Sequence, residues 1–262
     1  MVKLSYDSLR TRMKIRLKAV YRLAIATTML STLAALPSYP IDYDKLILKV
    51  QSKYQKLDKI HGSAFIIGPA KNGRCVLLTA WHVLSEYKND PIFIYSPNGY
   101  KFTVYKHQFT FNNKQAFDDP KLDLAFMPAP SCRNSLNLPF AKASSIVVST
   151  KVAVKGYPLD KQQVIFPTTV EGRITQYNDN DGYDLNYDAP TAKGFSGGPV
   201  INIDGSEILA LHGFTDAVNE ERGEELRVGG RGISAPLVYR FLRDNGYKMP
   251  RSSKPTCLVG VC

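Results

Sequence analysis

Three short segments of the sequence carry side chains that could work together in covalent chemistry. One apolar run leads into His82, Asp123 stands at the start of another, and Ser196 lies within Gly194-Phe195-Ser196-Gly197-Gly198-Pro199. A serine hydroxyl is a poor nucleophile on its own, but a histidine can accept its proton while a carboxylate orients and stabilises the imidazolium. The third segment is the most specific, because each glycine has a separate backbone role around an exposed hydroxyl. The residue types therefore predict attack by Ser196 on a carbonyl group.

In order and spacing, these segments resemble the trypsin-like (chymotrypsin-fold) serine peptidases. His82 and Asp123 are 41 residues apart, and Asp123 and Ser196 are 73 apart, which leaves room for intervening strands. The resemblance covers about residues 54–244 and is to short exported bacterial members, while residues 188–191 are also similar to the HtrA branch. It implies an all-β fold of two packed antiparallel β-barrels, with the active site in the cleft between them and a C-terminal helix.

The same resemblance implies roles for individual residues. His82 would be the general base, Asp123 would orient it, and Ser196 would be the nucleophile. The backbone N–H groups of Gly194 and Ser196 would form the oxyanion hole, which binds the charge of the tetrahedral intermediate. The positions matched to substrate-binding segments are Pro190, Thr191, Leu211, His212 and Gly213. No metal ion or cofactor is expected, and the implied partners are protein or peptide substrates.

Two of these positions bear on substrate preference. Pro190 is six residues before Ser196, where a charged residue would set a preference for Arg or Lys. The resemblance therefore implies a small or apolar P1 residue, the residue on the acyl side of the cleaved bond. His212 has two interpretations, a residue that lines the substrate pocket or an ordinary strand residue.

The sequence departs from the animal digestive members of this family in three places. Phe195 stands where those enzymes carry an aspartate that pairs with a newly cut N-terminus, so activation by that ion pair is not expected. Cys75 precedes His82 with no cysteine just after it, so the disulfide that brackets the histidine is not expected either. Trp81 replaces a small residue, and its ring would either crowd the site or pack outward.

The positive charge of the chain is concentrated at its N-terminus. The net charge is +11, but residues 1–38 hold seven basic residues and one acidic residue, which leaves 27 basic and 22 acidic residues in the remainder. The basic stretch is followed by an uncharged run, residues 23–36, which is typical of a secretory signal and short for a membrane span. We expect export to the periplasm or beyond, with membrane attachment only if this leader is retained. Nucleic-acid binding is not expected, because no long basic run remains.

The rest of the chain contains many short apolar or alternating runs separated by turn signals, the pattern of an all-β sandwich or barrel. The one helix expected after the leader spans residues 235–245, with Gly246 suited to its C-terminal end. The predicted organisation is a signal peptide or anchor (1–38), a linker and first strand region (39–53), the peptidase domain (54–246) and a tail (247–262). The four cysteines permit two disulfides, and Cys257 and Cys262 could close a loop in the tail, whereas Cys75 could equally be a buried apolar residue.

Two other functions compete with a serine endopeptidase. The segment around Ser196 also fits the G-x-S-x-G elbow of α/β-hydrolases, but that fold requires an acidic residue and then a histidine after the serine, and few helical segments are present to cover a parallel sheet. Only His212 follows, 16 residues later. The second alternative is a catalytically silent trypsin-like domain that binds peptides or proteins. The presence of all three catalytic residue types argues against it.

Overall fold

The computed structural model describes residues 42–52, 61–85, 87, 90–111, 122–159, 166–178, 182–219 and 225–252, all within the compact unit Asp42–Cys262. The predicted leader, and Cys257 and Cys262 with their possible disulfide, lie outside the described residues. Among the described residues, no helix has the length and apolar character that a membrane span requires.

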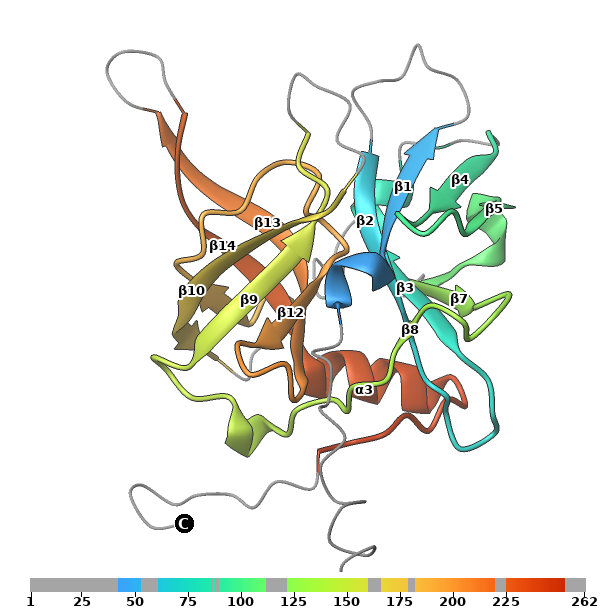
Figure 1. The fold of residues 1–262 in the computed structure, drawn as a ribbon. Helices are drawn as coiled ribbons and strands as arrows, with labels where there is room; N and C mark the ends of the chain where they lie inside the picture. Colours follow the sequence, from blue (N-terminus) through green and yellow to red (C-terminus); the bar gives the residue numbers. More distant parts are fainter. Residues whose placement is uncertain are drawn as a thin grey trace, which may run out of the picture. The chain divides into compact units, whose positions relative to one another are not determined.

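The first half of the described chain forms an eight-stranded sheet that curls without closing (Figure 1). Its strands follow the order β5-β4-β1-β2-β3-β7-β6, and β8 pairs with β2. Their bounds are β1 Ile47–Ser52, β2 His61–Ile67, β3 Val76–Ala80, β4 Ile92–Tyr95, β5 Lys101–Val104, β6 Thr110–Phe111, β7 Leu124–Pro128 and β8 Ser135–Leu136. The first of the two expected barrels is thus a curled half-barrel, and one of its strand pairs, β2–β8, is parallel.

The second half forms a closed barrel in the order β10-β11-β14-β13-β12-β9. The bounds are β9 Lys151–Gly156, β10 Thr168–Tyr177, β11 Leu185–Tyr187, β12 Pro199–Asn202, β13 Ile208–Asn219 and β14 Glu225–Ser234. Each pair of neighbouring strands in this barrel is antiparallel. Closure leaves the barrel without a free edge, which lets all of its strands satisfy their backbone hydrogen bonds.

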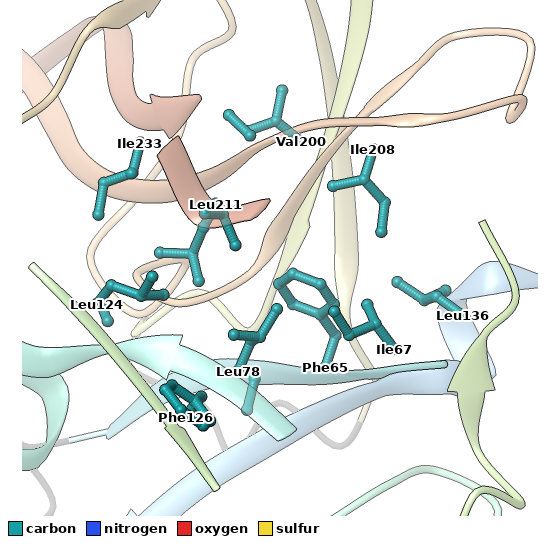
Figure 2. Packing of buried hydrophobic residues seen from close by; sticks show 14 of the residues in the cluster. Phe65, Ile67, Leu78, Leu124, Phe126, Leu136, Val200, Ile208, Leu211 and Ile233 are labelled. Atoms are coloured by element: carbon teal, nitrogen blue, oxygen red, sulfur yellow. The ribbon is translucent and has the colours of Figure 1, made fainter. Parts of the chain in front are cut away.

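The two sheets share a hydrophobic core. Figure 2 shows Phe65 and Leu78 of the first sheet beside Leu211 of the barrel, and all three side chains are fully buried. Strands β1, β2, β3 and β7 are nearly continuous buried runs, whereas the end strands β5 and β6 are mostly exposed or half-buried. This core fixes the strand ends that carry the chemistry.

The predicted C-terminal helix is confirmed as α3, Ala235–Asp244. Pro236 stands in its first turn, where a missing N–H costs nothing. Gly246 follows the helix with φ +88°, the left-handed conformation that glycine adopts readily. The side chains of Leu237 and Leu242 are buried, so the helix is held by its apolar face. Four short helical turns complete the described elements: η1 Tyr43–Leu46, α2 Trp81–Ser85, η3 Lys106–Gln108 and η4 Ala143–Ser145.

Residues on both sides of 54–246 pack on the domain. Strand β1 lies between β2 and β4. After the helix, Phe140 N–H donates to the carbonyl of Pro250, and Ser252 N–H donates to that of Phe140. Met249 is buried. The packed part of the domain therefore extends at least from residue 42 to residue 252.

Cys75 forms a disulfide with Cys132. Cys75 is buried, which agrees with one interpretation of the sequence. It is half of a disulfide, however, and not a free thiol. The bond joins the residue before β3 to the segment before β8. It therefore ties together two parts of the open sheet.

Candidate active site

His82 and Asp123 are brought together by neighbouring elements of the first sheet. His82 lies in the short helix α2, directly after β3, and Asp123 lies just before β7, the antiparallel partner of β3. The Nδ1 atom of His82 is 2.5 Å from Asp123 Oδ2, and the His82 backbone N–H donates to Asp123 Oδ1 at 2.7 Å. Because the carboxylate binds both the ring and the backbone of His82, it fixes the orientation of the imidazole.

The two side chains differ in exposure in a way that suits a base and its orienting group. The His82 side chain is 46% exposed, whereas that of Asp123 is 14% exposed. The ring of His82 can therefore meet a ligand, while the carboxylate behind it is shielded from water. With Nδ1 held as a donor to Asp123, the other ring nitrogen is the one that can accept a proton.

Asp123 has a third partner, Tyr183, which the sequence did not single out. The Tyr183 hydroxyl donates to Asp123 Oδ2 at 2.5 Å. Burial, and then the nearby Asp123 carboxylate, raise the pKa of Tyr183 far above its ordinary value, so this hydroxyl remains a donor. The Tyr183 ring occupies the space where Gly213 has no side chain, since a Cβ at Gly213 would lie 2.0 Å from Tyr183 Cε1.

Ser196 follows a tight turn that only glycine allows. Phe195 N–H donates to the carbonyl of Ala192 at 3.1 Å, and Gly194 has φ +95° within this turn. A positive φ at the third turn residue is the requirement of a type II turn. A Cβ on Gly194 would also lie 2.2 Å from the carbonyl oxygen of Tyr157. Both the backbone angle and the close contact therefore exclude a side chain at this position.

Ser63 of β2 joins the first sheet to this turn. Its hydroxyl donates to the carbonyl of Gly194 at 2.8 Å and accepts from the N–H of Tyr157 at 2.9 Å. Its backbone N–H donates to the carbonyl of Ser196 at 2.8 Å. One residue of the first sheet thus holds both sides of the nucleophile segment.

The hydroxyl of Ser196 donates to the carbonyl of Gly213 at 3.0 Å. This contact is one end of a series of neighbours that runs from Ser196 to Gly213, from Gly213 to the Tyr183 ring, and from Tyr183 through Asp123 to His82. This series connects the three residues that are predicted to act together. The Ser196 proton points to a carbonyl in this structure.

The N–H groups predicted for the oxyanion hole belong to Gly194 and to Ser196, which stand on either side of Phe195. Within the part of the chain that the structure describes, neither Gly194 N–H nor Ser196 N–H donates to a protein acceptor. Two adjacent unengaged donors beside a serine hydroxyl are what an oxyanion requires.

The predicted substrate-binding residues fall into different environments. Pro190 is exposed. Leu211 is fully buried in the core of Figure 2, so only its backbone could meet a substrate. Thr191 and His212 are fully buried polar residues, and the Thr191 hydroxyl donates to the carbonyl of Gly229 at 3.2 Å.

His212 has an unusual environment for a strand residue. Its Nδ1 atom forms a hydrogen bond with the hydroxyl of Tyr187, a second residue not singled out by the sequence. The other ring nitrogen, Nε2, is buried without a protein partner among the described residues. Burial, with a smaller contribution from the charge of His82, lowers the pKa of His212 to about 3. The ring is therefore neutral at physiological pH, and one of its polar atoms is unsatisfied, a condition that costs about 1–3 kcal/mol.

The ring of Trp81 packs outward, which is one of the two alternatives that the sequence left open. It stacks on Phe111 with 3.8 Å between ring centroids, and the ammonium of Lys106 lies 4.8 Å from its centroid. Phe195, which replaces the aspartate of the digestive enzymes, is buried with its ring edge-on to His212. Within the described ranges, no group of three or more His, Cys, Asp or Glu side chains is placed to bind a metal ion.

Tyr183, Tyr187 and Ser63 are the residues that sequence reasoning missed. Tyr183 is 60 residues from Asp123, and Ser63 is 131 residues from Gly194. Ser63 lies within residues 54–244, the range of the family resemblance, but no spacing rule marks the role of its hydroxyl. The two tyrosines carry no local signal.

The sheet, the barrel and this site define a chymotrypsin-like architecture. Residues 62–211 match the trypsin-like peptidase domain. This match covers more than half of the chain, so the chain belongs to the trypsin-like peptidase family. A search of curated proteins finds no match.

Solved structures share the fold at low sequence identity. The active form of the Rv3671c protease from M. tuberculosis superposes with a TM-score of 0.54 at 20% identity, over 82% of this chain and 87% of that one. A serine endoprotease from Yersinia pestis gives 0.55 at 18% identity, over 79% and 67%. The HtrA-type protease AlgW with a tripeptide gives 0.55 at 18% identity, over 77% and 60%.

Proposed function

We propose that the protein is a serine endopeptidase that hydrolyses peptide bonds through His82, Asp123 and Ser196. The observation that carries this proposal is the series of neighbouring groups that leads from Ser196 through Gly213 and Tyr183 to the Asp123–His82 pair. Membership of the trypsin-like peptidase family supports the same reaction.

The proposed reaction has two halves. Ser196 Oγ attacks the scissile carbonyl while His82 Nε2 takes the hydroxyl proton, and the N–H groups of Gly194 and Ser196 bind the oxyanion. His82 then gives the proton to the leaving amine as the carbon–nitrogen bond breaks, which leaves an acyl-enzyme. In the second half, water attacks the ester with His82 as base, and Ser196 regains its proton. Asp123 remains ionised and stabilises the imidazolium in both halves.

The first step requires Ser196 to change its hydrogen bond. Its hydroxyl now donates to the carbonyl of Gly213, and for the reaction it would have to donate to His82 instead. A substrate N–H that binds the Gly213 carbonyl would displace the serine proton. Substrate binding would thus prepare the nucleophile, which agrees with the predicted role of Gly213 in pairing with a substrate backbone.

The proposal is tested with a fluorophosphonate probe on the full chain. The wild type is expected to be labelled and to cleave casein, whereas Ser196→Ala and His82→Ala are expected to lose both. The matched control Ser144→Ala removes an exposed serine hydroxyl elsewhere and is expected to behave like the wild type. Labelling that persists in Ser196→Ala would refute the assignment. A wild type that neither labels nor cleaves would favour the silent binding domain.

We also propose that the protein is exported, on the basis of its basic and apolar leader. The disulfide Cys75–Cys132 supports this proposal, because disulfides persist mainly in oxidising compartments. N-terminal sequencing of protein from cell fractions tests it. The expected result is a start after the leader in an exported fraction, and an intact Met1 in the cytoplasm would contradict export.

A further inference from the structure

The helix α2, which carries His82, is too short to keep its own position. It has five residues, Trp81–Ser85, and isolated helices shorter than about 12 residues are marginal in water. The N–H of Trp81 donates to the backbone carbonyl of Asp123, and the N–H of His82 donates to the Asp123 carboxylate. These two bonds hold the start of the helix. Its other end depends on contacts with other segments.

The ammonium group of Lys106 supports that other end. Its Nζ atom donates to the carbonyl of Ser85 at 3.0 Å, and the Ser85 hydroxyl donates to the carbonyl of His82 at 2.8 Å. The last carbonyls of a helix have no partner within the helix, and a lysine donor can satisfy them. The end of α2 is therefore bound to η3, a segment that follows it by 21 residues.

The same ammonium group faces an aromatic stack beside His82. It lies 4.8 Å from the centroid of the Trp81 ring, which attracts a cation, and this ring stacks on Phe111 with 3.8 Å between centroids. Trp81 directly follows β3, and Phe111 is the last residue of β6. Strands β3 and β6 are the two neighbours of β7, the strand that Asp123 precedes. The stack thus joins the strands on either side of the one that positions Asp123.

These contacts lie where the first sheet stays open. Strand β5 ends the strand order on one side, the two-residue strand β6 ends it on the other, and η3 connects them along the chain. In a closed barrel, hydrogen bonds would join such end strands. Here Trp81, Phe111 and Lys106, which we call the aromatic clamp, link β6 and η3 to the helix α2.

We propose that the aromatic clamp positions His82 on Asp123, with Lys106 as the group that closes it. The inference rests on the proposed peptidase function, in which His82 accepts the proton of Ser196. It also explains the tryptophan beside His82, because a small side chain at that position could not reach Phe111. A displacement of about 1 Å can cost about 10²-fold in rate, so loss of the clamp should lower kcat. KM should change little, because the clamp acts on the proton transfer and not on the bound substrate.

The first test compares full-length variants on a fluorogenic peptide taken from a casein cleavage site, with kcat expressed per site labelled by the fluorophosphonate probe. Trp81→Ala is expected to lower kcat about 10²-fold and Lys106→Met about 10-fold, with KM within about 2-fold of the wild type. Lys106→Arg keeps the cation and its donors and is expected to restore most of kcat. Because Lys106 lies in a surface turn, its variants keep the test decisive if Trp81→Ala does not fold.

Two control variants change similar side chains elsewhere in the same half of the domain. Lys101→Met removes another cation above a ring, since Lys101 Nζ lies 4.3 Å from the centroid of Phe93. His107→Leu changes an exposed histidine that follows Lys106 in η3. Both variants are expected to keep the kcat of the wild type. An equal loss of kcat in Lys101→Met and Lys106→Met would overturn the inference.

The intrinsic fluorescence of the protein reports on the clamp directly, because Trp81 is the only tryptophan in the sequence. Lys106→Met is expected to shift its emission and to increase its quenching by acrylamide, whereas Lys101→Met should change neither. An opened clamp with the wild-type kcat per labelled site would overturn the inference. A loss of activity that comes only from a smaller labelled fraction would also overturn it, because that result indicates lost stability and not a displaced His82.

A measurement that needs no catalysis separates this inference from the peptidase proposal. The Nδ1 proton of His82, bound to Asp123, is expected to give a downfield ¹H NMR signal that His82→Ala lacks. Lys106→Met and Trp81→Ala should shift or broaden this signal, and Lys101→Met should not. If the probe does not label the wild type, the peptidase proposal fails and the signal still decides. An unchanged signal in both clamp variants would overturn the positioning of His82.

Discussion

The two halves of the domain hold the site by different means. The first sheet is open, is tied by the disulfide Cys75–Cys132, and supplies His82 and Asp123 from neighbouring strand ends. The barrel is closed by hydrogen bonds around its whole circumference and supplies Ser196 from a glycine turn. A closed barrel has no edge to protect, whereas an open sheet needs another restraint. The proposed base and the proposed nucleophile therefore lie on two differently built sheets.

Alignment of the two halves depends on a small number of hydrogen bonds that join the first sheet to the barrel half. Ser63 reaches from the first sheet to Gly194 and Ser196 of the barrel half. Tyr183 reaches in the opposite direction, from the barrel half to Asp123. Each half thus orients the reactive group of the other. Substitutions can test the contribution of each half separately.

The largest expected effect comes from the first sheet. Asp123→Asn should lower kcat by about 10⁴-fold, because an amide would present the wrong donor pattern to His82 and would not stabilise the imidazolium. The melting temperature should change little, since the amide is of similar shape. Steady-state kinetics and thermal unfolding measure the two quantities. Asp90→Asn is a suitable control, and activity within 10-fold of the wild type in Asp123→Asn would contradict the assigned role.

The next effect comes from the barrel half. Gly194→Ala should lower kcat by about 10²- to 10³-fold, because the added Cβ meets the Tyr157 carbonyl at 2.2 Å and displaces an oxyanion donor. The control is Gly73→Ala, where φ is +75° but no atom lies within 4 Å of the added Cβ. That change should cost only about 1–2 kcal/mol of stability and leave kcat unaltered. Equal kcat losses in both variants would show that backbone strain alone, and not the site, is responsible.

Loss of the disulfide should affect stability more than chemistry. Changing Cys75 and Cys132 together to Ala should reduce the free energy of unfolding by about 2–4 kcal/mol, because the unfolded chain gains freedom. Denaturant titration measures the loss, and reduction of the wild type should reproduce it. The kcat of the folded variant should stay close to that of the wild type. A large fall in kcat at low temperature would mean that the bond also positions His82.

Acid should destabilise the barrel through His212. Its pKa falls from an ordinary 6.5 to about 3 on folding, so the unfolded chain binds a proton that the folded chain excludes. Its contribution to stability is complete above pH 6.5 and is lost as the pH falls toward 3, by up to about 1.4 kcal/mol per pH unit. Unfolding free energies between pH 7 and 5 should show a shallower slope for His212→Leu than for the wild type or His107→Leu. An identical slope in all three proteins would contradict the buried neutral histidine.

The smallest expected effect comes from loss of the hydrogen bond between Tyr183 and Asp123, which joins the two halves. Tyr183→Phe should lower kcat about 10-fold, the value of one hydrogen bond to an ionised group. Removing a donor from the carboxylate strengthens the pull of Asp123 on the imidazolium, so the acid limb of the pH–kcat/KM profile should move to higher pH. Tyr239→Phe, at a tyrosine on α3, is the control. A fall in kcat without any movement of the acid limb would indicate a purely structural role.

The sequence by itself determined the chemistry-bearing residues and the class of fold. His82, Asp123 and Ser196 could be predicted because residue type and chain order suffice to suggest their roles. The sequence gives Gly194 a special backbone role, and its φ of +95° agrees with that role, because glycine adopts positive φ readily. The helix Ala235–Asp244 was predictable from its apolar face and Gly246. All of these signals are local along the chain.

Only the tertiary structure decided the partners that complete the site. Tyr183 meets Asp123 across 60 residues and Ser63 meets Gly194 across 131, and contacts between distant segments leave no periodic signal in a single sequence. The same holds for the Tyr187–His212 pair and for the disulfide Cys75–Cys132, each of which depends on how strands are paired. The direction of the Ser196 hydroxyl and the open form of the first sheet are likewise properties of packing. The chemical type of each residue is known from its own position in the sequence. The geometry of its hydrogen bonds depends on which strands lie side by side in the folded protein.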